Sequence, residues 1–123
     1  MNACAVPDGF AHFRLTPVSW HAELLSFELN SLTGTIPTEI GLMTGIEAMI
    51  FSWNQLTGTI PTELAFLKSV TEIALNDNLL EGTLPPELGN SLTSLSDFFV
   101  HNNPGITGQV PETYGNFTNI STF

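Results

Sequence analysis

Basic residues are almost absent from this chain. Arg14 and Lys68 stand against twelve acidic residues, so the formal net charge at pH 7 is −10 over 123 residues. A surface of this charge repels phosphate backbones, which excludes nucleic acid as a favoured partner. A neutral or basic partner approaches such a surface more easily, although dispersed glutamates are also typical of simple solubility.

Long apolar runs are absent as well. No stretch approaches the ~18 apolar residues that a membrane-spanning helix needs, although a hydrophobic content of 42% is enough to fill a core. The first twenty residues contain Asp8 and Arg14 and no apolar run of signal-peptide type. We therefore expect one water-soluble domain, with neither membrane insertion nor an export signal in this stretch.

The motifs of common catalytic and metal sites are also lacking. There is no phosphate-binding loop ending in Lys-Ser/Thr, no His-Glu-x-x-His, no cysteine pair with metal spacing and no Gly-x-Ser-x-Gly. His101 lies within reach of Asp77 or Asp97 if neighbouring strands are ~4.8 Å apart, and we interpret this as an exposed polar contact rather than a general base. We expect no enzymatic activity, no cofactor and no metal.

What the chain does contain is one motif written four times. It reads NSLTGTIP at 30–37, NQLTGTIP at 54–61, NLLEGTLP at 78–85 and, more loosely, NPGITGQVP at 103–111. The glycines at 34, 58, 82 and 108 are therefore spaced by 24, 24 and 26 residues. Self-similarity with a period in this range is typical of stacked structural units, so the period predicts a solenoid.

Apolar residues precede each motif at fixed distances. They stand three, five and eight positions before the asparagine, as Phe51, Met49 and Ile46 do before Asn54. Two apolar residues separated by one residue indicate a short strand with one buried face, because side chains alternate across a strand. Each unit is therefore expected to contain one short, half-buried strand.

These residues together read L-x-x-L-x-L-x-x-N-x-L-x-G-x-I-P, which resembles the plant-type leucine-rich repeat over roughly residues 19–123. The chain looks like part of the ectodomain of a leucine-rich-repeat receptor, or a relative of the polygalacturonase-inhibiting proteins. The resemblance implies an α/β solenoid: a right-handed coil of about four and a half repeats, with a parallel concave β-sheet and short 3₁₀ or helical turns on the convex side. It further implies non-catalytic recognition of a protein, peptide or carbohydrate, and an extracellular or cell-surface location for the full-length parent.

The period also divides the chain. Repeats start near 22, 46, 70, 95 and 120, so residues 22–123 form the solenoid and the last repeat is truncated. Residues 1–21 lie outside the period and are expected to form an irregular leader or a partial N-terminal cap, because aromatic residues such as Phe10, Phe13 and Trp20 are unusual in disordered leaders. We interpret the chain as a fragment of a longer protein.

The single cysteine departs from the pattern that the resemblance implies, in which paired cysteines close the N-terminal cap. Cys4 has no partner in this sequence, so either the partner was lost with missing sequence or the protein uses no disulfide, as a reducing compartment would require. The absence of a signal peptide leaves an intracellular location open.

Two matches to the N-glycosylation acceptor occur, at Asn116 and Asn119. This is as many as chance predicts, and we interpret both as chance matches.

Each recurrent polar or special residue has a physical role that can be stated in advance. A buried asparagine needs partners for both ends of its amide, so a column of these residues is expected to bond backbone groups where the chain leaves each strand: Asn30, Asn54, Asn78 and Asn103. The glycines predict positive φ or close approach between units. The prolines predict extended segments after which only a helical turn or two can form.

Two departures from the strict period are expected to be loops. Asn90-Ser91 adds one residue, and Pro104-Gly105 adds another between the fourth asparagine and its glycine. Both pairs carry residues that are typical of turns.

Strand residues whose side chains point away from the core do not pack in it, so the scaffold does not dictate their identities. Ile50, Trp53 and Phe99 are expected to stand exposed among polar and acidic residues on the concave side, which makes them candidates for ligand contact. The full candidate set is Ile50, Trp53, Asn76, Asp77, Phe99 and His101. The alternative is that these aromatics pack against further repeats or against each other.

A second hypothesis uses a different face. The threonines around the motif glycines would form a regular lattice one coil apart, like the flat arrays of ice-binding solenoids: Thr33, Thr35, Thr57, Thr59 and Thr83. β-branched residues also fit an extended backbone for structural reasons, and Gln109 interrupts the column. Freezing-point hysteresis would separate this hypothesis from protein or glycan binding.

Overall fold

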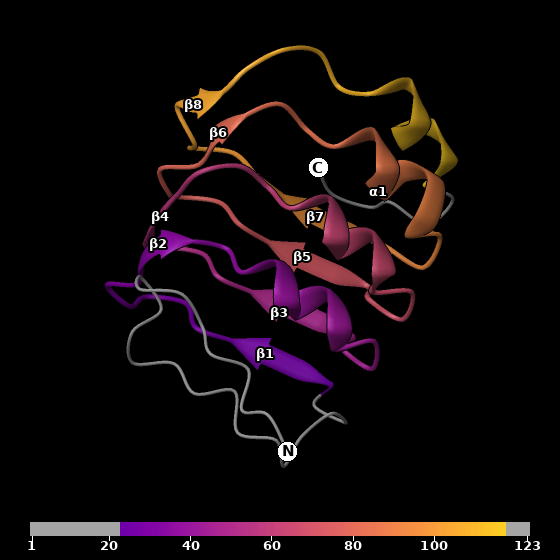
Figure 1. Ribbon diagram of the computed structural model, residues 1–123, viewed down its shortest axis with the longest axis horizontal. Helices are drawn as coiled ribbons and strands as arrows, with labels where there is room; N and C mark the ends of the chain where they lie inside the picture. The colour runs from indigo at the N-terminus through magenta and orange to yellow at the C-terminus, as the bar shows by residue number, and fades with distance from the viewer. Residues whose placement is uncertain (1–22, 118–123) are drawn as a thin grey trace.

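The computed structural model describes residues 23–117 and shows four coils stacked one on another (Figure 1). Each coil contributes a strand, a second short strand and a helical turn, in that order. The elements are β1 (Leu24–Ser26), β2 (Thr33–Thr35), η1 (Thr38–Leu42), β3 (Ala48–Ile50), β4 (Gln55–Thr57), η2 (Thr62–Phe66), β5 (Glu72–Ala74), β6 (Glu81–Gly82), α1 (Pro86–Ser91), β7 (Asp97–Phe99), β8 (Gly105–Ile106) and η3 (Glu112–Asn116). The solenoid expected from the period is confirmed. Both the leader at 1–21 and the start of the fifth repeat, from residue 118, lie outside the described residues.

The main sheet is parallel and has the strand order β1-β3-β5-β7. Its register follows the sequence period, because Leu25 pairs with Met49, Met49 with Ile73 and Ile73 with Phe98. The helical turns lie on the opposite side of the coils, and the short strands β2, β4, β6 and β8 form the connecting edge (Figure 1). We call the solvent side of the main sheet the concave face and the side of the helical turns the convex side.

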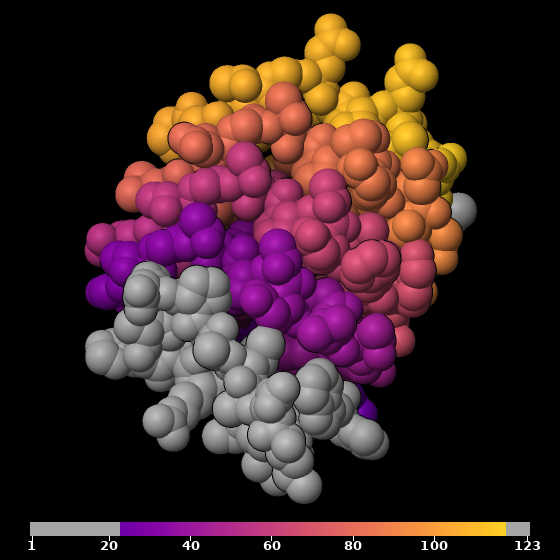
Figure 2. Space-filling model, viewed as in Figure 1, coloured from indigo at the N-terminus to yellow at the C-terminus, as the bar shows by residue number. Residues whose placement is uncertain are grey.

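The core runs through the stack between these layers. The central residue of each main strand points into it, and Met49, Ile73 and Phe98 are completely buried. Successive coils also appear as adjacent bands across the molecular surface (Figure 2). Burying one such side chain contributes about 1.5–3 kcal/mol, and much of that burial is supplied by the neighbouring coil. The stacking therefore stabilises every coil through the next one.

The asparagine column joins the coils through backbone groups. The Asn78 Nδ2 group donates to the carbonyl of Phe51 in the preceding coil (2.9 Å) and to that of Leu75 in its own coil (3.1 Å). Its Oδ1 atom accepts the N–H of Leu56 at 3.0 Å. Asn54 and Asn103 repeat this pattern, and all three side chains are buried. The expected role of the column is confirmed at these positions.

Asn30 differs from the other three, because its side chain is exposed. Its Nδ2 group donates to the carbonyls of Phe27 and Glu28, both in its own coil. The expectation of a buried amide is wrong for this copy, since no earlier coil covers it within residues 23–117.

The asparagines also set the register of the second row of strands. Asn54 Oδ1 accepts the N–H of Leu32 in the preceding coil. The pairing of β2 with β4 is therefore shifted by two residues from the sequence repeat, so that Thr35 pairs with Thr57 rather than with its repeat equivalent Thr59. Thr33 pairs with Gln55. The straight threonine columns expected from the sequence are therefore not formed, although the threonines themselves are exposed.

The motif glycines do what the pattern predicted. Gly58 has a φ of +74°, and a Cβ atom built there would lie 2.8 Å from the Cγ2 atom of Thr35 in the preceding coil. Gly82 and Thr59 form the same contact at 3.0 Å. The threonine methyl group thus occupies the space that the glycine leaves open, which gives the threonine a structural role.

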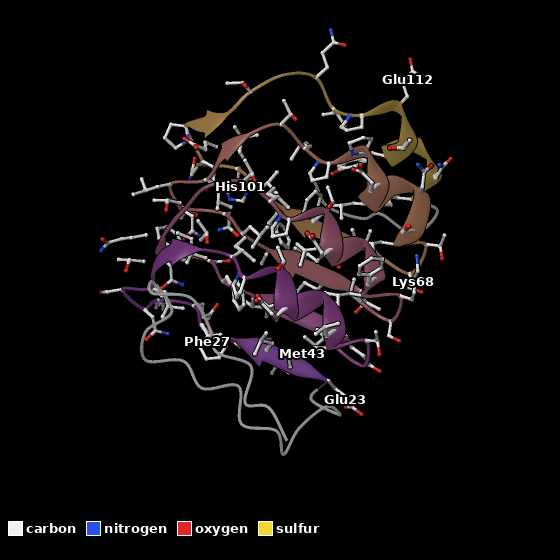
Figure 3. All side chains as sticks on the ribbon, in the orientation of Figure 1. Glu23, Phe27, Met43, Lys68, His101 and Glu112 are labelled. Carbon is white, nitrogen blue, oxygen red and sulfur yellow. The ribbon has the colours of Figure 1, made fainter. Side chains whose placement is uncertain are left out.

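The convex side consists of single turns that start directly after a proline. The N–H of Ile40 bonds the carbonyl of Pro37, and Leu64 does the same with Pro61. The described helices are all short, and none in residues 23–117 has the length and apolar character needed to cross a bilayer. Lys68 and Glu112 lie on this side of the molecule (Figure 3).

The extra residue at Asn90-Ser91 is not a loop as expected but the end of α1. In the shorter repeats the turn closes from Met43 to the carbonyl of Ile40, three residues back, whereas the N–H of Leu92 reaches the carbonyl of Leu88, four residues back. One additional residue has therefore widened a 3₁₀ turn into an α-helical one. At the other insertion the expected turn is present, because the Asn103 carbonyl accepts the N–H of Ile106.

We predict that Asn78→Ala destabilises the fold by about 1–3 kcal/mol, because it orphans the buried N–H of Leu56 and removes one of the two hydrogen bonds to the carbonyl of Phe51, which keeps the bond from Asn54. Chemical denaturation followed by circular dichroism measures the loss. The matched control is Asn30→Ala, whose exposed amide bonds only to its own coil among the contacts described. Equal losses for the two variants would show that the inter-coil bonds contribute nothing specific.

Gly58→Ala is expected to destabilise the chain by about 1–3 kcal/mol through its positive φ and its contact with Thr35. Adding Thr35→Ser removes the methyl group and should recover part of this loss, leaving the backbone strain. Gly115→Ala, where nothing lies within 4 Å of the added carbon, serves as the control and should change stability by under about 0.5 kcal/mol. Thermal unfolding of these three variants and of the wild type tests this, and no recovery on adding Thr35→Ser would contradict the contact.

Candidate functional site

The concave face carries four columns of outward side chains, one residue from each coil in every column. The first two follow directly from the strand register: Leu24, Ala48, Glu72 and Asp97; Ser26, Ile50, Ala74 and Phe99. The next two lie just beyond the strand ends: Glu28, Ser52, Asn76 and His101; Leu29, Trp53, Asp77 and Asn102. Scaffold packing does not dictate these identities, so this face can vary without loss of the fold.

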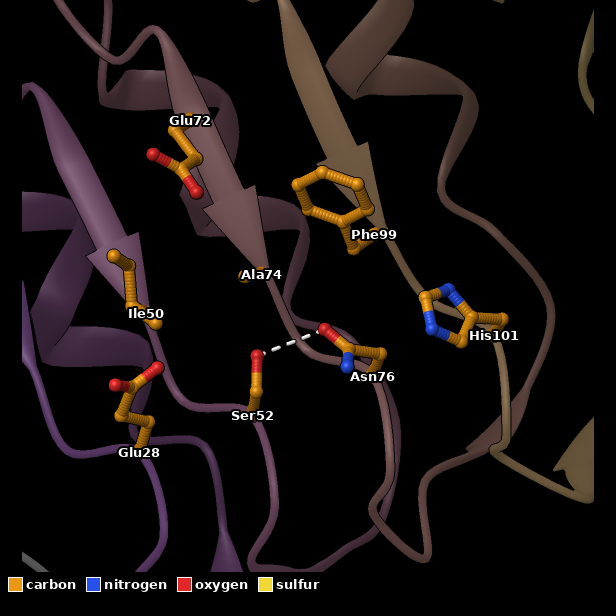
Figure 4. Close-up of a pocket in the computed structure, with 8 residues that line it drawn as sticks. All are labelled: Glu28, Ile50, Ser52, Glu72, Ala74, Asn76, Phe99 and His101. Carbon is orange, nitrogen blue, oxygen red and sulfur yellow. Dashed lines mark hydrogen bonds between the residues drawn. The ribbon is translucent and has the colours of Figure 1, made fainter. Parts of the chain in front are cut away.

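A shallow, open depression of about 290 Å³ lies on this face (Figure 4). Its floor exists because Ala74 stands in register between two larger residues, Ile50 and Phe99. Ala74 is buried beneath its neighbours, whereas Ile50 and Phe99 are half-buried rather than fully exposed as the sequence suggested. The lining residues are Glu28, Ile50, Ser52, Glu72, Ala74, Asn76, Phe99 and His101.

A chain of polar side chains crosses three coils at the edge of this depression. The Ser52 hydroxyl, which is buried, donates to Asn76 Oδ1 at 2.8 Å (Figure 4). The Asn76 Nδ2 group donates to one oxygen of Asp77 at 2.7 Å, and the Asn102 Nδ2 group donates to the other at 2.8 Å. Because a carboxylate only accepts, Asp77 fixes which way both amides point.

These contacts stabilise the charged form of Asp77. Hydrogen bonds from Asn102 and then Asn76, together with the nearby His101, hold the pKa of this carboxyl group below its usual value. Asp77 is therefore a fixed negative charge beside the depression, held by residues of two coils. No group of three or more metal-ligating side chains occurs within residues 23–117.

Aromatic rings form the wall on the side of the fourth coil. Phe99 and His101 lie with ring centroids 6.3 Å apart in an edge-to-face arrangement. The His101 side chain is exposed, as expected, and its backbone carbonyl accepts the N–H of Asp77. The two rings thus present an apolar face and a polar edge within the same wall.

Bulky residues occupy an unusual backbone conformation next to this site. Leu29, Trp53, Asp77 and Asn102 all have φ between 56° and 60°, the left-handed region. Asp and Asn adopt this region readily, but leucine and tryptophan do so at a cost of about 1–2 kcal/mol. Leu29 and Trp53 are moreover 74% and 55% exposed. Neither conformation nor burial explains why these two residues are apolar.

The structure brings together most of the candidates named from the sequence. Ile50, Asn76, Phe99 and His101 line the depression, and Asp77 is bonded to Asn76 beside it. Trp53 is exposed but does not line the depression.

Glu72 was missed by sequence reasoning, as were Glu28, Ser52 and Ala74 as lining residues. The signal for Glu72 was its place directly before the buried Ile73, because the residue before an inward-pointing one must point outward.

Comparison with known proteins gives matches among solved structures. No protein-family model matches the sequence, and no curated protein matches it. The structure of PEPR1–AtPEP1 superimposes with a TM-score of 0.79 and 35% identity, over 82% of this chain and 14% of that one. The plant peptide hormone receptor RGFR1 in complex with RGF2 gives 0.75 and 34%, over 78% of this chain and 15% of that one.

A third similar structure is the Arabidopsis receptor kinase HAESA in complex with the peptide hormone IDA and the co-receptor SERK1. It has a TM-score of 0.75 and 29% identity, over 80% of this chain and 16% of that one. The present chain therefore spans 14–16% of the length of these three proteins. The four in-register motifs, the stacked parallel sheet and these similarities agree with one another. The chain belongs to the plant-type leucine-rich-repeat family.

Proposed function

We propose that this chain is a non-catalytic recognition module that binds a peptide or a protein segment on its concave face. The observation that carries this proposal is the depression between Ile50 and Phe99, which four coils build from outward-pointing residues of the main sheet. Its volume of about 290 Å³ lies at the lower end of the range for small-molecule pockets. It suits one or two side chains of a longer ligand better than a whole small molecule.

The arrangement around the depression supports this reading. An apolar wall, an aromatic ring and a preorganised polar network are typical of surfaces where a few anchor residues dominate binding. The Ser52–Asn76–Asp77 network is already bonded internally, so ligand binding need not first order it. The structural relatives include a peptide hormone receptor and a receptor kinase bound to a peptide hormone. This similarity supports, as part of the proposal, an extracellular receptor-like parent protein, with an inhibitor-like parent as the alternative.

Trp53→Ala combined with Phe99→Ala is expected to reduce ligand binding at least tenfold while leaving the fold intact, because both side chains lie at least partly open to solvent on this face. Random linear peptides displayed on phage and enriched on the wild-type chain supply the ligands, and fluorescence polarisation measures their affinities. Circular dichroism confirms that each variant is folded.

The matched control for this pair is Leu42→Ala combined with Phe66→Ala. These two side chains are 60% and 58% exposed but belong to the helical turns η1 and η2 on the convex side. The control removes a comparable exposed apolar surface and should leave binding unchanged. Wild-type affinity in the concave-face double variant, or an equal loss in the control, would contradict the proposal.

A further inference from the structure

The concave depression also indicates what kind of side chain it accepts, an inference that rests on the proposed function. We propose that it binds a cationic side chain of a peptide ligand, and arginine in preference to lysine. Two features of the lining carry this proposal: an apolar slot closed below by a small residue, and carboxylates beside that slot that pair with no Lys or Arg among residues 23–117.

The slot is formed by side chains of different size on three neighbouring strands. Ile50 and Phe99 stand on either side of Ala74, whose methyl group leaves the space between them open (Figure 4). The space is shallow and open, and the apolar side chains of Ile50 and Phe99 bound it on two sides. The methylene stem of a long charged side chain fits this shape, because it buries apolar surface while its head group stays in contact with polar groups.

Apart from His101, every titratable side chain that lines the depression is a carboxylate. Glu28 and Glu72 both line the depression, and in the view of Figure 4 Ile50 lies between them. Asp77 lies beside it with its charge fixed by two amide groups. Lys68, the one Lys or Arg among residues 23–117, is elsewhere, with its Nζ donating to the carbonyl of Ser91. Charge complementarity therefore favours a cation and disfavours the free carboxylate at the end of a peptide.

The aromatic wall distinguishes arginine from lysine. A guanidinium group is planar, so it can stack on the Phe99 ring while donating two parallel hydrogen bonds to a carboxylate such as that of Glu72. An ammonium group is a more strongly hydrated point charge and gains less from such a wall. The open shape of the depression further suits a side chain projecting from an extended backbone that crosses the sheet.

The test uses the full 123-residue chain and a positional library of short peptides with acetylated and amidated ends. One position at a time is fixed as arginine, lysine, citrulline, leucine or glutamate, and the remaining positions are randomised. Fluorescence polarisation measures binding. We expect one position at which arginine binds about tenfold more tightly than citrulline, its uncharged counterpart, and more tightly than lysine. Glutamate at that position should abolish binding.

Three variants locate the effect. Glu72→Gln removes one charge at nearly constant shape and should lower the arginine preference about five- to tenfold. Glu112→Gln makes the same change on η3 of the convex side and should leave the preference intact. Ala74→Leu fills the slot without changing any charge and should weaken all peptides, provided that circular dichroism shows a folded chain.

The outcomes separate this inference from the proposed function. Peptides that bind the wild type and lose affinity in Ala74→Leu, but do not distinguish arginine from citrulline, would overturn the inference and leave concave-face recognition standing. No binding by any peptide, or binding that Ala74→Leu leaves unchanged, would overturn both. A further outcome is that free spermidine displaces the bound peptide at the same concentration as the best competing peptide does. That result would show that charge alone is recognised, and it would also overturn the assignment of a peptide side chain.

Discussion

The structure depends on asparagine amides that bond two coils at once. Each of the three buried asparagines, Asn54, Asn78 and Asn103, donates to a carbonyl of the preceding coil and accepts an N–H from it. These groups lie where the chain leaves the main sheet, a place where backbone polar groups would otherwise be buried without partners. Leaving one such group unpaired costs about 1–3 kcal/mol. The stack is therefore held by a few bonds that repeat between each pair of neighbouring coils in residues 23–117, in addition to the shared hydrophobic core.

The residues that hold the coils together and the residues on the outer face of the sheet are different sets, which explains why a binding surface can form on the sheet. Inward residues, asparagines, glycines and prolines satisfy the requirements of the coil, so the outward residues of the strands are free to vary. In this chain one column of outward residues contains Ile50, Ala74 and Phe99, which are paired in register on neighbouring strands. A large, a small and a large side chain side by side make a hollow on a sheet that is otherwise regular. The site is thus a consequence of differences between repeats, whereas the fold is a consequence of their similarity.

The same distinction decides how much could be predicted from the sequence. The period predicted the register of the main sheet, the inward positions such as Met49 and Ile73 and the buried amides, because each depends on a local pattern repeated along the chain. The two-residue offset at Thr35 and Thr57 was not predicted, since it follows from a side chain that reaches across coils. The half-burial of Ile50 and Phe99 likewise depends on their neighbours on other strands.

The four residues with a left-handed backbone conformation show how a difference between repeats can be interpreted: Leu29, Trp53, Asp77 and Asn102. Every coil places one residue at φ between 56° and 60°, so the turn imposes this conformation whatever residue is present. Asp77 and Asn102 suit it and bond each other, which stabilises the turn. Trp53, in the same conformation, has neither advantage: its side chain is 55% exposed, and the left-handed region is unfavourable for it. A residue that costs the scaffold both in conformation and in exposed apolar surface, on the same face as the depression, therefore supports the concave-face recognition that we propose.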